Sequence, residues 1–218
     1  MNSPIIQLLV LAGIAVFLIL RLRSVLGSRE GFEKPPMPAP SQTRRRGDFE
    51  VIEGGPDRDI TDHVEEGSDS AEALAAMKRV DQDFGVGDFL QGARGAYEMI
   101  LMAFERGELT EVRPFLSDDV YEAFAGVVEE RQEKGLTIDA AFVGISEISL
   151  RDAEFDATTQ EAEITVRFVG ELTSVVRDKA GDVVEGSATE IKRQRDSWTF
   201  ARKMGTGDPN WQLVATGE

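Results

Sequence analysis

The sequence predicts an α+β domain, because the spacing of its apolar residues changes once along the chain. From about Ser70 to Gly135 they recur at the three- and four-residue spacing of amphipathic helices. From Thr137 onward they alternate with polar residues, which is the period of half-buried strands. Helices followed by a run of strands are typical of α+β folds. We therefore expect helices packed on one curved antiparallel sheet that forms an open cone.

Residues 1–26 are predicted to form a transmembrane anchor. Apolar residues run almost unbroken from Ile5 to Leu20, and Arg21 and Arg23 follow directly. About 20 such residues cross a bilayer, and arginines near a helix end reach the lipid headgroups. A cleaved signal peptide is the alternative, but it needs a basic segment before the apolar run. Because every base here follows that run, the anchor is the preferred interpretation.

The distribution of basic residues also predicts the orientation of the anchor. Residues 1–46 carry seven basic and two acidic residues, and none of the bases precedes the apolar run. The positive-inside rule then places the N-terminus outside and the long C-terminal part in the cytoplasm.

Residues 27–70 are predicted to be a disordered linker. Four prolines between Pro35 and Pro40 favour extended backbone, and Arg44 to Arg46 form a basic cluster. An acidic, glycine-rich stretch from Asp48 to Glu66 follows and has few large apolar side chains to bury. Anionic lipid would attract the basic part and repel the acidic part, which would hold the domain away from the bilayer. A plain spacer is the alternative.

The remainder of the chain is strongly acidic. Residues 47–218 carry 17 basic and 38 acidic residues, within a net charge of −16 for the whole chain. Nucleic-acid binding is not expected, because it requires Lys and Arg to neutralise phosphates. Basic or amphipathic polypeptide segments are the favoured partners on electrostatic grounds. Solubility alone is an equal alternative explanation of the acidity.

Metal and cofactor chemistry is not expected from the residue types present. The chain has no cysteine, and His63 in the linker is its only histidine. Cysteine-based zinc sites and histidine triads therefore cannot be formed. We expect no metal, no cofactor and no catalytic residue.

Three helices are predicted before the sheet. Ser70 is expected to cap the first helix, Asp88 the second and Ser117 the third, because short polar side chains accept hydrogen bonds from the first turn. The second helix contains Gly92 and Gly95, each of which costs up to about 1 kcal/mol relative to alanine. We expect close approach of another backbone to offset that cost.

The predicted strands follow in sequence as an antiparallel meander. They comprise residues 142–150, 163–176, 183–195 and 197–202, with 211–216 closing the sheet. A hairpin loop at 179–182 joins the second and third strands, and Gly170 is expected to form a bulge.

Several segments in this order resemble the Tim44-like domain family. They are FLQGARGAYEMILMAFERGE, LSDDVYEAF, VEERQEKG, AEITVRF, GDVVEG, DSWTFARK and DPNWQLVAT. The resemblance extends over about residues 83–216 and assigns residues 71–218 to the domain. It implies a nuclear-transport-factor-two-like cone with a large apolar pocket. The N-terminal anchor is similar to the bacterial TimA-type branch, which implies a single-pass protein of the bacterial inner membrane.

The resemblance also implies a set of residues that line the pocket. A large apolar cavity suits a lipid tail or an amphipathic helix. A filled hydrophobic core is the alternative for each side chain. The candidate pocket residues are Tyr97, Ile100, Phe104, Phe124, Phe168, Trp198 and Phe200.

The function predicted from these features is binding and tethering. In mitochondria the family member lies on the inner-membrane surface, contacts incoming presequences and recruits a heat-shock chaperone. The chaperone-binding region lies largely outside the shared domain, so chaperone recruitment is not carried over. We expect a membrane-anchored adaptor and not an enzyme. One alternative is a lipid-binding or membrane-complex assembly factor, and another is a cone-fold enzyme with a buried carboxylate.

Overall fold

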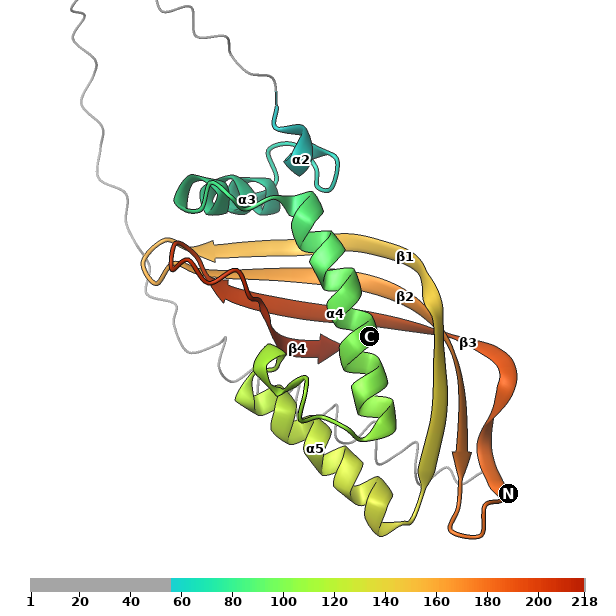
Figure 1. Cartoon of the computed structure of the whole chain (residues 1–218). Coiled ribbons are helices and arrows are strands. Elements are labelled where there is room, and N and C mark those ends of the chain that lie inside the picture. Colours follow the sequence, from blue (N-terminus) through green and yellow to red (C-terminus); the bar gives the residue numbers. More distant parts are fainter. Residues whose placement is uncertain (1–55, 218) are drawn as a thin grey trace, which may run out of the picture. The chain divides into compact units, whose positions relative to one another are not determined.

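The computed structural model of the chain describes residues 56–217 as helices packed on one four-stranded sheet (Figure 1). The sheet order is β1-β2-β3-β4, and every neighbouring pair is antiparallel. The predicted α+β class is therefore confirmed. The elements are α2 (Arg58–Thr61), α3 (Asp69–Val80), α4 (Val86–Arg106), η1 (Arg113–Phe115), α5 (Asp118–Glu133), β1 (Thr137–Asp156), β2 (Glu161–Arg177), β3 (Val183–Lys203) and β4 (Gln212–Gly217).

The sheet is strongly bent, and α4 and α5 lie on the inner side of the bend (Figure 1). The pairing of β1 with β2 shifts register at three places, between Phe142 and Gly144, Ile145 and Glu147, and Leu150 and Asp152. Such bulges bend a strand and increase its twist. Gly170 pairs with Ile145 and Gln194, and the shift between Ile145 and Glu147 lies directly opposite it. The bulge expected at Gly170 is therefore present at this place in the sheet, but its extra residue is on β1.

The strands of the C-terminal half are longer than their sequence pattern suggests. The two segments predicted within residues 183–202 form the single strand β3. The ladder continues through the polar residues between them, where Asp196 pairs with Phe168 and Ser197 with Arg167. Backbone hydrogen bonds do not depend on an apolar side chain, and therefore the strand passes through a polar stretch without a break.

Ordered structure begins earlier than the predicted linker boundary at residue 70. Asp57 caps α2, and Ile60 within this short helix is 5% exposed. Ser68 caps α3, whereas Ser70, which was expected to do so, donates a hydrogen bond to Asp152. The last part of the predicted linker therefore belongs to the folded domain.

The N-terminus of α4 is capped from outside the helix. Its N-cap residue is Gly85, and the backbone amides of Val86 and Gly87 donate to the carboxylate of Asp59 at 2.8 and 2.9 Å. Asp88, the predicted cap, lies in the first turn. Burial would raise the pKa of Asp59, but the hydrogen bond from Lys78, these two amides and the charge of Lys78 together lower it. An acidic group at a helix N-terminus also complements the helix dipole.

The glycines of α4 do not have the environment that was predicted for them. Gly92 and Gly95 are exposed, and a Cβ atom added to either would meet nothing within 4 Å. Within the described residues no second backbone approaches these positions, so the predicted close packing is wrong for the isolated chain. Their cost to helix stability is not offset by internal packing.

The predicted anchor residues Ile5, Leu20, Arg21 and Arg23 lie outside the described residues, as does the linker up to residue 55. Between residues 56 and 217, none of the helices has the length and apolar character needed to cross a membrane.

Candidate functional site

An aromatic cluster fills the space between α4 and the sheet. The Tyr97 ring stacks on Phe168, with centroids 4.4 Å apart, and lies 4.7 Å from the ring of Trp198. Trp198 in turn contacts Phe200 on the same strand. Five of the seven predicted pocket residues are less than 5% exposed: Tyr97, Ile100, Phe168, Trp198 and Phe200.

The other two predicted pocket residues lie where α4 meets α5. Phe104 and Phe124 are partly buried, with ring centroids 4.7 Å apart. The Arg131 guanidinium lies 4.3 Å from the centre of the Phe104 ring and donates to the Phe104 carbonyl oxygen. Burial lowers the pKa of Arg131, and Glu105 partly offsets that change. These side chains thus join two helices.

The seven predicted residues therefore do not line one open pocket in the described structure. Four of them are joined by ring contacts, Ile100 is buried in the same core, and the remaining two pack at a helix junction. The physical reason is that stacked and edge-to-face rings lie in direct contact and leave little free space between them. The two hollows described below have other residues in their walls.

A polar pair lies at the border of the aromatic cluster. The Tyr97 hydroxyl donates to a carboxylate oxygen of Asp196 at 2.5 Å, and the Gln194 side chain donates to the other oxygen. Burial raises the pKa of Tyr97, and the hydrogen bond and charge of Asp196 raise it further. Tyr97 is fully buried, so its hydroxyl stays protonated and serves as a hydrogen-bond donor.

Gly170 makes this arrangement sterically feasible. A Cβ atom at position 170 would lie 2.5 Å from the Tyr97 hydroxyl oxygen and 2.9 Å from a carbon of its ring. The role of Asp196 was not predicted from the sequence. The feature that could have indicated it is the two-residue period of strands, which places Asp196, Trp198 and Phe200 on one face.

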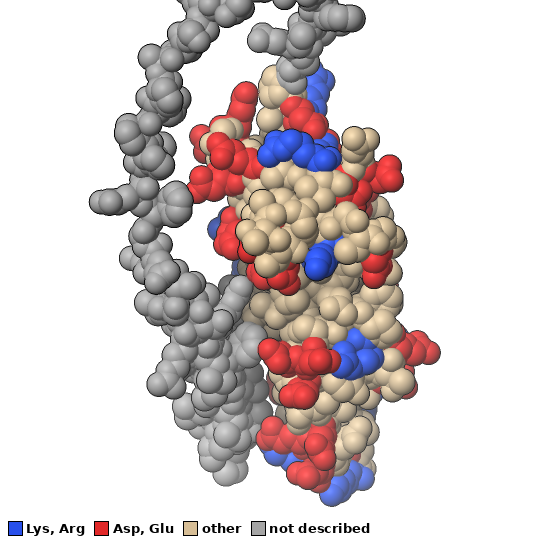
Figure 2. Space-filling model, turned by 90° about the vertical axis from the view of Figure 1, so that its left-hand side faces the viewer, with Lys and Arg blue, Asp and Glu red and all other residues tan. Residues whose placement is uncertain are grey.

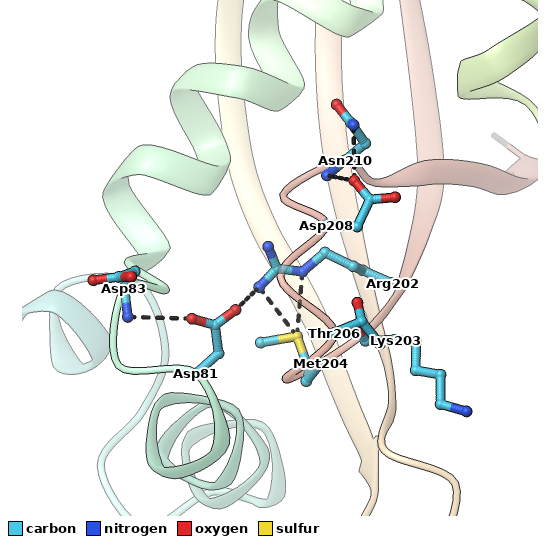
Figure 3. Close-up of polar contacts among 8 residues, drawn as sticks. All are labelled: Asp81, Asp83, Arg202, Lys203, Met204, Thr206, Asp208 and Asn210. Carbon is cyan, nitrogen blue, oxygen red and sulfur yellow. Dashed lines mark hydrogen bonds and ion pairs between the residues drawn. The ribbon is translucent and has the colours of Figure 1, made fainter.

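A second polar cluster joins the α3–α4 corner to the sheet (Figure 3). The Arg202 side chain is 8% exposed and pairs with Asp81 at 2.7 Å. Its guanidinium lies 5.0 Å from the centre of the Trp211 ring and also donates to the Met204 sulfur. Because Asp81 directly follows α3 and Arg202 is the penultimate residue of β3, this ion pair links segments far apart in the sequence.

A surface hollow of about 440 Å³ lies beside Arg202. Asp208 in its wall accepts two hydrogen bonds from Asn210, one from the backbone and one from the side chain (Figure 3). The volume of this hollow falls within the range of small-molecule sites. Its walls, however, combine acidic and basic side chains with Phe115 and Pro114.

A second hollow, which we call the α4 groove, has a volume of about 260 Å³. Met102 and Val112, which are 7% and 1% exposed, form part of its base together with Ala103. Met99, at the rim, is 40% exposed. The remaining lining residues are charged, namely Glu98, Arg106, Glu108 and Glu111.

The surface of the described domain is acidic. Residues 56–217 carry 34 acidic and 17 basic residues. Figure 2 shows one face, on which acidic side chains gather in the upper and lower parts around a broad uncharged area. Among the described residues no cluster of His, Asp and Glu has the arrangement of a metal site.

These features define the class of the protein as an acidic α+β domain with helices on one side of a bent antiparallel sheet. The family model named Tim44-like domain matches residues 70–218. The chain therefore belongs to the Tim44-like domain family, which confirms the resemblance found in the sequence motifs.

The related proteins are considerably longer than this chain. The mitochondrial import inner membrane translocase subunit TIM44 is 25% identical over 150 residues in Homo sapiens and 24% identical in Rattus norvegicus. Each match covers 67% of this chain but only 33% of the relative. A solved structure, the intermembrane space region of chloroplast protein ARC6, matches with a TM-score of 0.41 and 13% sequence identity. This match covers 59% of the present chain and 94% of the ARC6 chain.

Proposed function

We propose that this protein is a membrane-tethered adaptor whose folded domain binds basic or amphipathic polypeptide segments at the cytoplasmic face of the bacterial inner membrane. The observation that carries the proposal is the match of the Tim44-like domain to residues 70–218. The relatives that match this chain over 150 residues are named as subunits of a mitochondrial import inner membrane translocase. The predicted anchor at residues 1–26 would supply the membrane attachment.

The charge of the domain supports a cationic ligand. Acidic residues outnumber basic ones two to one between residues 56 and 217. Complementary charge steers encounters and excludes partners of the same sign. By the same argument, we do not propose nucleic acid as a partner of this domain.

We propose binding without catalysis. The carboxylate of Asp196, next to the aromatic cluster, accepts hydrogen bonds from the side chains of Tyr97 and Gln194. Because Tyr97 is fully buried, this carboxylate is suited to a structural role and not to proton transfer with a substrate.

Affinity capture of the full chain from gently solubilised membranes tests the proposal. Bound proteins and lipids would be identified by mass spectrometry, with a variant that carries only residues 1–55 as the control. We expect protein partners that depend on residues 56–218. Enrichment of a specific lipid without such a protein would contradict the adaptor role and favour the lipid-binding alternative.

A further inference from the structure

We infer that the α4 groove is the docking site for a basic amphipathic helix of a partner polypeptide. This inference rests on the proposed function and assigns it to one surface. The groove lies between α4 and the segment that follows it, with an apolar base formed by Met102, Ala103 and Val112. An amphipathic helix binds such a groove by inserting apolar side chains spaced three and four residues apart.

The size of the groove favours side chains over a lipid or a small molecule. Its volume of about 260 Å³ is below the range of roughly 300–1,000 Å³ found for small-molecule pockets. Met99 extends the apolar surface outward and is 40% exposed. Methionine is flexible and polarisable, so it adapts to anchors of different shape.

The charges at the rim determine which helix the groove favours. Glu98, Glu108 and Glu111 line it together with a single base, Arg106. Within the described part of the chain, none of these three glutamates forms an ion pair. Lysine or arginine side chains flanking the apolar anchors of a partner would pair with them, whereas an acidic helix would be repelled.

The surface of α4 next to the groove allows close approach. Gly92, Gly95 and Met99 are spaced three and four residues apart, so they lie on one stripe of the helix. Both glycines are exposed, and a Cβ atom added to either would contact no other atom within 4 Å. Small side chains reduce the distance at which a second helix can pack. The unfavourable helix propensity of these glycines would then be offset only in the complex.

The test uses the full chain in nanodiscs of phosphatidylcholine, a zwitterionic lipid without net charge, with empty nanodiscs as the blank. The probe is a fluorescent amphipathic peptide of leucine and lysine, about 18 residues or five helical turns long. Peptides with glutamate in place of lysine, and with the lysine and leucine order scrambled, are the comparisons. Fluorescence anisotropy gives the dissociation constants.

Two sets of variants locate the site. Gly95→Leu places a bulky side chain on the approach surface, and we expect roughly tenfold weaker binding. Glu98→Gln and Glu111→Gln should each weaken binding roughly two- to fivefold at low salt. The matched controls are Gly126→Leu and Glu129→Gln on α5, where Gly126 also has open space above its Cα. These controls should leave binding unchanged.

A stability measurement separates binding from folding. Gly95→Ala adds a better helix former without a clash, so the melting temperature should rise by roughly 2 °C while probe binding weakens. If the probe binds all α4 variants as tightly as the wild type, the groove is not the site, although the adaptor function stands. The inference is also overturned if sedimentation shows that Gly95→Leu disrupts a dimer, because a second copy would then cover this face.

A failure of the wild-type chain to bind the leucine–lysine probe would overturn the groove assignment by itself. The capture experiment would then decide separately whether the domain has polypeptide partners at all.

Discussion

Tyr97 illustrates how one buried hydroxyl constrains its neighbours on two strands. It donates to Asp196 on β3 and lies so close to β2 that only a glycine is accommodated at position 170. The Gly170→Ala variant should therefore lose roughly 1–3 kcal/mol of stability in urea unfolding, because the added methyl group forces Tyr97 to move. Gly144→Ala is the matched control, since a Cβ atom at this strand glycine meets nothing within 4 Å.

A double variant tests the stated cause. The atom closest to a methyl group added at residue 170 is the Tyr97 hydroxyl oxygen, so Tyr97→Phe should relieve part of the clash. The loss in the double variant should be smaller than the sum of the two single losses. Strict additivity, or an equal loss in Gly144→Ala, would contradict this account.

Helix α4 shows how an element can depend on a segment outside it. Its first amides are bonded to Asp59 of α2, and replacing this acid by Asn should cost about 1 kcal/mol. The pKa of Asp59 is lowered in the folded state, so its contribution is present above the ordinary carboxyl pKa and is lost as pH falls through the folded value. The stability difference between the Asp59→Asn variant and wild type should therefore shrink between about pH 5 and pH 2. A stability difference that stays constant over this pH range would contradict this account.

The elements also show what the sequence allowed us to predict. Periodicity was sufficient for the three main helices and the antiparallel sheet, because each buries one face along a regular spacing. Contacts between distant segments have no local pattern, which is why the Asp59 cap and the Arg202–Asp81 pair were missed. Aromatic residues were correctly placed on inner faces, but whether they line a pocket or fill a core depends on packing, which spacing does not specify.

At the scale of the whole molecule, the excess of acid should make binding and stability respond to salt in opposite directions. Screening weakens attraction between the acidic domain and a basic helix, so the dissociation constant of the leucine–lysine probe should increase between roughly 0.05 and 0.5 M salt. Residues 56–217 carry 34 acidic and only 17 basic residues, so the domain has net self-repulsion. The same screening reduces this repulsion, and the urea midpoint should therefore rise.

Measuring both quantities on one full-length preparation shows whether salt acts on the complex or on the fold. Weaker binding by a more stable domain cannot result from unfolding, and it would therefore assign the effect to charge pairing with the ligand. The Glu98→Gln, Glu111→Gln double variant should show a shallower salt dependence of binding with an unchanged salt dependence of stability. Binding of the probe that is insensitive to salt would instead indicate recognition by apolar contacts alone.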